Sequence, residues 1–136
     1  MIGLIIATHA DLARELVNAT EMVIGSLHNV RAICIHREDG LEEIREAMAQ
    51  AIEEVGRDGE GVAIMTDMFG GTPANISLSF LEPEKVEVLT GVNLPMVLKF
   101  FNSREGVSLD ELVGMLMAYG QQSIAKASEF LSGRKS

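Results

Sequence analysis

Four short apolar runs alternate with segments of helical periodicity, and this alternation constrains the fold more than any other feature of the sequence. The runs cover residues 1–8, 30–35, 61–66 and 86–89. Strands covered on both faces read as continuous apolar stretches, and the segments between these runs are long enough for helical crossovers. We therefore predict an α/β fold with a single doubly wound open sheet, in which four parallel strands are flanked by helices.

The segments between the runs carry helical patterns with recognisable ends. Apolar spacing predicts helices over residues 11–24, 41–55, 73–78 and from about 96 to 101. The spacing of Ser108 and Glu111 is that of a capping box, which predicts a last long helix reaching about Tyr119 or beyond. No repeat or interdomain linker divides the sequence, so we expect residues 1–136 to form one domain with a flexible tail at about 131–136.

The composition excludes several classes of function. The formal charge is −9 with scattered Lys and Arg, whereas nucleic-acid binding requires clustered basic residues. The single cysteine, Cys34, allows no intramolecular disulfide and fits a reducing compartment. No apolar stretch approaches the length of a membrane span, and no basic region precedes the first apolar run as in a signal peptide. We expect a soluble, cytoplasmic protein.

Polar residues follow the predicted strands at the edge where a parallel sheet binds ligands. Thr8 and His9 end the first run, Thr66 and Asp67 end the third, and Asn93 lies in the loop beyond the fourth. These positions predict a site at the carboxyl edge of the sheet.

His9 and Asp67 are the candidate catalytic residues. A neutral imidazole is a nucleophile near pH 7, and a neighbouring carboxylate fixes its tautomer. Asp67 is placed to be that neighbour if the first and third strands are adjacent. Taken singly, His9 could be a helix-terminus residue and Asp67 a turn former. A zinc site would need one more ligand, for which His28 and His36 fit poorly, so we expect no metal and no cofactor; His36 borders the crevice or is a solvated strand-end residue.

Gly70, Gly71 and Thr72 are candidate phosphate-binding residues. Thr72 suits an N-cap and Pro73 the first helical position, so a helix is expected to begin here. Two preceding glycines let the backbone approach a ligand, and free N–H groups at a helix N-terminus bind anions. An ordinary glycine-rich turn is the alternative. Together with His9 and Asp67, the segment predicts a phosphohistidine site.

Three segments resemble the signatures of one family. Residues 5–10 (IIATHA), 67–75 (DMFGGTPAN) and 91–96 (GVNLPM) are similar, in order and spacing, to those of the IIA component of mannose-type sugar phosphotransferase systems. The resemblance implies that His9 accepts a phosphoryl group from the carrier protein HPr and passes it to a IIB component, while membrane IIC and IID subunits import the sugar. It also implies that Asp67 hydrogen-bonds the histidine and that the backbone around Gly71 and Thr72 holds the phosphate.

The resemblance carries three further expectations. Relatives are typically homodimers with an exchanged antiparallel edge strand, which here would come from residues 123–130, unless these extend the last helix. Relatives usually have glycine after the active histidine, whereas this chain has Ala10, which is unfavourable if the backbone there needs positive φ. Because the sequence stops at Ser136 with no second domain, the IIB partner is expected on a separate chain.

Three other functions remain open from the sequence. A regulatory IIA protein, or one that serves a dihydroxyacetone kinase, would have the same site. A receiver-like domain phosphorylated on Asp67 would need an acidic pair after the first strand, where this chain has His9 and Asp11. A small anion-binding module would bind phosphate without covalent modification.

Overall fold

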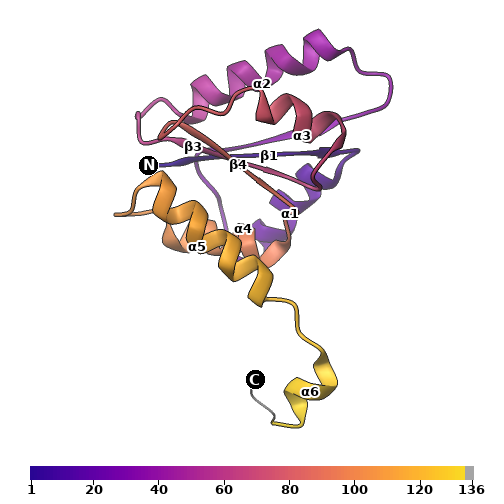
Figure 1. The fold of residues 1–136 in the computed structure, drawn as a ribbon, viewed down its shortest axis with the longest axis vertical. Coiled ribbons are helices and arrows are strands. Elements are labelled where there is room, and N and C mark those ends of the chain that lie inside the picture. The colour runs from indigo at the N-terminus through magenta and orange to yellow at the C-terminus, as the bar shows by residue number, and fades with distance from the viewer. Residues whose placement is uncertain (134–136) are drawn as a thin grey trace.

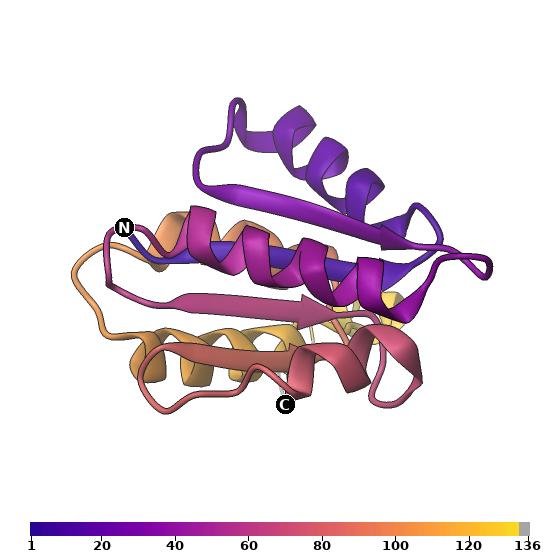
Figure 2. The same cartoon turned by 90° about the horizontal axis from the view of Figure 1, so that it is seen from above.

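The computed structural model describes residues 1–133, in which a four-stranded sheet lies between two layers of helices (Figure 1). The strands are β1 (Gly3–His9), β2 (Val30–Ile35), β3 (Val62–Thr66) and β4 (Val86–Thr90). Their order in the sheet is β2-β1-β3-β4, and every neighbouring pair is parallel. All four strands therefore end at one edge of the sheet, as Figure 2 shows. The predicted α/β fold with four parallel strands is confirmed.

The helices divide between the two faces of the sheet (Figure 1). One face carries α1 (Leu12–Ile24), α4 (Leu94–Ser103) and α5 (Leu109–Gln122), and the other carries α2 (Leu41–Val55) and α3 (Gly71–Leu78). The two central strands are consequently covered on both sides. This double coverage explains why their sequences are continuously apolar rather than alternating.

Successive residues of β1 contribute to two separate cores. Leu4 and Ile6 pack with α1, α4 and α5, whereas Ile5 and Ala7 pack with α2 and α3. All four side chains are fully buried. Each buried Leu or Ile contributes about 1.5–3 kcal/mol from apolar burial. The strand that carries His9 at its end is thus held rigidly from both faces.

Local sequence signals explain where α5 begins but misplaced the start of α3. The Ser108 hydroxyl accepts a hydrogen bond from the backbone N–H of Glu111, whose carboxylate accepts one from the Ser108 N–H, both at 3.1 Å. The capping box expected at α5 is therefore present. At α3 the expected start was wrong, because the helix begins at Gly71 with Gly70 as N-cap, so that Pro73 is its third residue. The missing N–H of Pro73 still falls in the first turn, where no intrahelical partner is required.

The C-terminal segment leaves the body of the protein after α5. Helix α5 ends at Gln122, and the short helix α6 (Ala127–Leu131) lies apart from the sheet (Figure 1). In this chain residues 123–130 form neither an edge strand nor an extension of α5. Of the tail expected to be flexible, residues 134–136 lie outside the described residues. Within residues 1–133, no helix is long and apolar enough to cross a membrane.

Candidate active site at the carboxyl edge of the sheet

His9 and Asp67 meet at the ends of two adjacent strands. Ala7 of β1 pairs with Thr66 of β3, so the next residue of β3's chain, Asp67, comes alongside His9. The Asp67 Oδ2 atom lies 2.9 Å from His9 Nδ1 and also accepts a hydrogen bond from the His9 backbone N–H at 3.1 Å. The imidazole is 49% exposed and the carboxylate only 15% exposed. The adjacency on which the sequence prediction depended is therefore present.

This contact assigns the two nitrogens of the His9 ring. Because a carboxylate only accepts hydrogen bonds, Nδ1 carries the proton and Nε2 keeps its lone pair in the neutral ring. The other Asp67 oxygen, Oδ1, is buried and has no hydrogen-bond partner within the described residues. Leaving a buried acceptor unpaired costs about 1–3 kcal/mol, which indicates that this carboxylate is not arranged for stability alone.

The Nε2 edge of His9 faces the start of α3. A Cβ atom placed on Gly71 would lie 3.0 Å from both His9 Nε2 and His9 Cε1, so a larger residue there would displace the ring. Gly70 and Gly71 have φ of 101° and 82°, a conformation that favours glycine. Within residues 1–133, the backbone N–H groups of Gly70, Gly71 and Thr72 have no hydrogen-bond partner. These free donors at a helix N-terminus form a site suited to an anion beside Nε2.

Thr8 and Thr66 lie behind this site and use their hydroxyls to shape its loops. The Thr8 hydroxyl accepts a hydrogen bond from the Ala13 N–H at 2.7 Å, and the Thr66 hydroxyl donates to the Met68 carbonyl at 3.2 Å. The Thr66 carbonyl also accepts from the N–H of Val92 in the loop beyond β4. Both threonines are fully buried. They join the loops that follow β1, β3 and β4.

Asn93 uses both ends of its amide within the fold. Its Oδ1 atom accepts from the Met96 N–H at the start of α4, and its Nδ2 atom donates to the Gly120 carbonyl in α5, each at 3.0 Å. The residue therefore caps α4 and joins it to α5. Its participation in the site stays a prediction.

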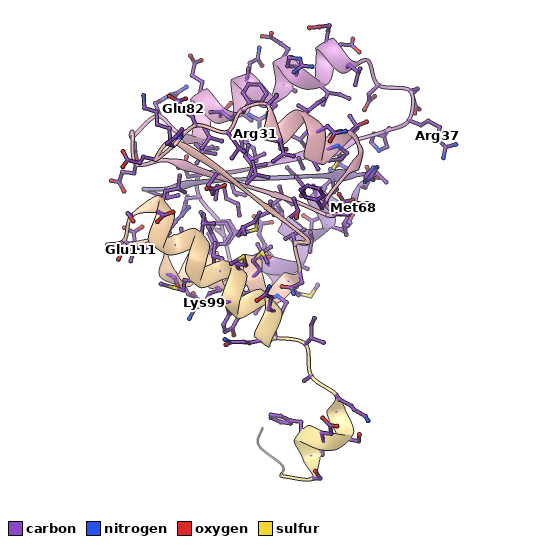
Figure 3. The ribbon with its side chains drawn as sticks, viewed as in Figure 1. Arg31, Arg37, Met68, Glu82, Lys99 and Glu111 are labelled. Atoms are coloured by element: carbon purple, nitrogen blue, oxygen red, sulfur yellow. The ribbon has the colours of Figure 1, made fainter. Side chains whose placement is uncertain are left out.

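The wall opposite α3 comes from the loop between β2 and α2. A groove of about 770 Å³ is lined by His9 and Thr72 together with residues of this loop, among them His36, Arg37 and Asp39. Figure 3 shows Arg37 and Met68 at this edge of the molecule, with Glu82 and Glu111 at the opposite end. Sequence reasoning placed His36 at most at the border of the crevice. The signal was present, since β2 pairs with β1 and ends one residue before His36.

His36 is joined to the first turn of α1. Its Nε2 atom lies 3.0 Å from Asp11 Oδ1, and its backbone N–H donates to Asp39 Oδ2 at 2.8 Å. The hydrogen bond from His36 lowers the pKa of the Asp11 carboxyl from its ordinary value, with a smaller contribution from the Arg14 guanidinium. Among the described residues, no group of three or more His, Cys, Asp or Glu side chains could hold a metal ion.

Comparison with known proteins identifies the family. The model of the family described as the PTS system fructose IIA component matches residues 3–117, which include every residue of the site above. The chain belongs to this family. It is a mannose-type IIA component of the sugar phosphotransferase system, and such components act as phosphocarriers.

Individual relatives agree with this assignment over most of their length. The fructose-specific EIIA component of Bacillus subtilis is 34% identical over 132 residues, which cover 96% of this chain and 90% of that protein. The sorbose-specific EIIA component of Lacticaseibacillus casei is 31% identical over 93% of this chain and 91% of its own length. The crystal structure of the EIIA component from Streptococcus agalactiae superposes with a TM-score of 0.85 at 26% identity, covering 94% of this chain and 98% of that one.

Proposed function

We propose that this IIA component accepts a phosphoryl group on His9 Nε2 from phospho-HPr and passes it to a IIB component for sugar uptake and phosphorylation. The observation that carries the proposal is the pairing of Nδ1 with Asp67 at 2.9 Å, which leaves Nε2 free and facing the N-terminus of α3. A nucleophile, an orienting carboxylate and an anion site thus lie together at one edge of the sheet.

The transfer step requires no additional reactant. The Nε2 lone pair forms a bond to phosphorus while the bond from phosphorus to the donor's imidazole nitrogen breaks, and that electron pair stays on the donor. The proton on His9 Nδ1 remains hydrogen-bonded to Asp67, so the imidazolium character that develops in the ring is stabilised without proton movement. Transfer to IIB is the same exchange in the opposite direction.

The N-terminus of α3 then holds the phosphoryl oxygens. The unpaired N–H groups of Gly70, Gly71 and Thr72 supply hydrogen bonds, and the helix dipole adds favourable electrostatics without a basic side chain. A site of this kind stabilises the transferring group by position and charge rather than by covalent chemistry. The partner proteins contribute the other half of the transition-state environment when they dock.

The surface around His9, which we call the docking face, carries exposed apolar side chains that suit a protein partner. Met68 and Phe69, in the loop after Asp67, are 52% and 75% exposed, and Leu12 at the start of α1 is 46% exposed. Apolar side chains around an exposed nucleophile favour a protein surface over a small substrate. The net charge of −9 favours partners with a basic contact face. HPr and IIB would use this face in turn, with IIC and IID acting downstream.

The proposal is tested by phosphorylation of the purified chain. Incubation with phosphoenolpyruvate, enzyme I and HPr is expected to add one phosphoryl group that is stable in alkali and lost in acid. The group should be absent in His9→Ala and retained in the control His28→Ala. In Asp67→Asn the rate should fall roughly 10- to 100-fold, because a hydrogen bond to a charged group contributes about 1.5–3 kcal/mol.

Two results would contradict the proposal. A folded wild-type chain that gains no mass with this donor would leave only non-covalent anion binding, and an alkali-labile product would indicate acylphosphate formation on a carboxylate such as Asp67. Addition of a IIB component then separates the roles. Transfer of the label to IIB supports sugar transport, whereas retention by IIA favours a regulatory or dihydroxyacetone-kinase-linked role.

We also propose that the chain is a homodimer in which residues 123–130 of each copy pack along the outer edge of the other copy's sheet, at β4. Within the described residues β3 is the only strand that pairs with β4, apart from an isolated bridge between Val86 and Glu82, and Ile124, Phe130 and Leu131 are 81%, 72% and 82% exposed. Light scattering after size exclusion should give a dimer for the full chain and a monomer after truncation at Gln122, with deletion of residues 133–136 as the control. A monomeric full chain at micromolar concentration would contradict this arrangement.

A further inference from the structure

The turn that follows His9 contains a strained residue. Ala10 has φ of 53°, one of three positive-φ residues other than glycine within residues 1–133. A Cβ atom makes this left-handed conformation unfavourable, and alanine has no polar side chain to form the local hydrogen bonds available to asparagine or aspartate. Such a conformation persists only where neighbouring contacts hold it. The contacts around Ala10 therefore hold the turn that directly follows His9.

One of these contacts comes from an aspartate that is not used as a helix cap. Asp11 occupies the N-cap position of α1, yet its side chain makes no capping hydrogen bond. The buried Thr8 hydroxyl caps the helix instead, because it accepts a hydrogen bond from the Ala13 N–H. The Asp11 carboxylate turns instead to the β2–α2 loop, where Oδ1 lies 3.0 Å from His36 Nε2.

The β2–α2 loop, which carries His36, is itself fixed by hydrogen bonds. The His36 backbone N–H donates to Asp39 Oδ2, and the Ala10 N–H donates to the carbonyl of Ile35, the residue before His36, at 2.8 Å. Ala10 is consequently flanked by its own backbone hydrogen bond to Ile35 and by the hydrogen bond that the side chain of the next residue, Asp11, accepts from His36. Arg14, at 3.2 Å from Asp11 Oδ1, is the only other charged partner of that carboxylate in residues 1–133.

We propose that the Asp11–His36 pair is a positioning contact for the phosphorylation site. It holds the Ala10 turn in its left-handed conformation and thereby keeps His9 Nε2 directed at the N-terminus of α3. Asp11 and His36 touch neither the phosphoryl group nor the reacting nitrogen, and they act through the backbone of Ala10. The inference rests on the proposed phosphorylation of His9.

A double-mutant cycle tests this linkage. In the wild-type chain, His36→Ala should lower the kcat of phosphorylation by phospho-HPr about two- to fivefold, the range expected for an exposed polar pair. In an Ala10→Gly background, where glycine adopts the left-handed turn without strain, the same substitution should have no effect on kcat. KM for phospho-HPr should stay constant throughout. His28→Ala, an exposed histidine outside the groove, is the matched control.

A second substitution separates positioning from general destabilisation. Asp11→Ala should reproduce the loss in kcat, and Asp11→Asn should restore it, because an amide oxygen can accept the hydrogen bond from His36 Nε2. The ¹⁵N resonances of the His9 ring in the unphosphorylated chain should shift in Asp11→Ala and return in Asp11→Asn.

The other outcomes overturn the inference. An equal loss of kcat in both backgrounds would mean that His36 acts without Ala10, and a raised KM alone would make His36 a docking contact. No change in either constant would remove any role for the pair. If the wild-type and His28→Ala chains are themselves not phosphorylated, the proposed function fails first, so the two failures are distinguishable.

Discussion

The two edges of the sheet manage unusual backbone and buried polar groups in opposite ways. At the amino edge, Asn29 has φ of 59°, but its side-chain amide donates to the Met1 carbonyl at 3.2 Å and to the Val55 carbonyl at 2.8 Å. The buried Arg104 guanidinium donates to the Ile2 carbonyl and lies 5.4 Å and 5.0 Å from the centres of the Phe100 and Phe101 rings. Polar groups here are matched within the fold.

At the carboxyl edge, groups of the same kinds lack partners or compensating contacts within the described residues. Ala10 has positive φ without a side chain that could compensate, Asp67 Oδ1 is buried and unpaired, and the first N–H groups of α3 have no partner within the described residues. The difference indicates that one edge serves stability and the other serves binding. Unsatisfied polar groups accumulate where a ligand and partner proteins are expected to complete them, whereas positive φ alone occurs at both edges, as at Glu84 before β4.

The largest effect should come from adding one methyl group to the amino edge. A Cβ on Gly3 would lie 2.6 Å from Val55 Cβ and 2.7 Å from Val55 Cγ2, and closer still to the Val55 carbonyl oxygen. Because the backbone of α2 cannot yield easily, Gly3→Ala should lower the free energy of unfolding by about 1–3 kcal/mol in urea titrations. Phosphorylation of the fraction that remains folded should be unchanged.

The control for this substitution is a glycine in open space. A Cβ on Gly114, on the exposed side of α5, would meet nothing within 4 Å. Gly114→Ala should therefore raise the free energy of unfolding by about 0.5–1 kcal/mol through helix propensity. If both substitutions had the same effect, the amino edge would not be the closely packed region described above.

The next largest effect should come from Gly71→Ala, and it should change the rate of His9 phosphorylation more than the free energy of unfolding. Gly71→Ala places a Cβ 3.0 Å from His9 Nε2 and Cε1, so the exposed ring has to move away from the phosphate site. We expect the rate of His9 phosphorylation to fall about tenfold, a change of about 1.4 kcal/mol in the barrier. Gly70→Ala also places alanine at positive φ, 101° with ψ of 165°, but its Cβ would meet nothing within 4 Å. A larger loss of rate in Gly70→Ala than in Gly71→Ala would refute the contact with the ring.

The fold was predictable where burial alone determines it. The continuous apolar runs of β1 and β3 predicted strands covered on both faces, and the capping box at Ser108 predicted the start of α5. The start of α3 was misplaced because two glycines at positive φ end the turn before Thr72. The segment after Gln122 was not predictable, since no local pattern determines its conformation and its apolar residues remain exposed in the single chain.

The positions of the candidate site residues at the strand ends were predictable, whereas their local geometry was less so. The adjacency of β1 and β3 was enough to expect His9 beside Asp67, because the carboxyl ends of parallel strands lie at the same edge of the sheet. The orientation of Nε2 toward Gly71, the left-handed Ala10 and the Asp11–His36 contact depend on turn dihedral angles. A single sequence specifies such angles weakly where alanine stands in place of glycine. The two glycines of the loop were expected to let the backbone approach a ligand, and their role in phosphate binding stays a prediction.

The smallest effect concerns acid stability and comes from Asp11. Its pKa is lowered in the folded chain, chiefly by the hydrogen bond from His36, so the folded state favours the ionised carboxylate. That contribution to stability is present above the unfolded-state pKa and is lost as the pH falls through the lower folded-state pKa. Urea titrations from pH 6 down to pH 3 should show wild type losing more stability than Asp11→Asn over the acid end of this range. Parallel curves for the two proteins would show that the carboxyl edge gains nothing from the charge of Asp11, and that only its geometry matters there.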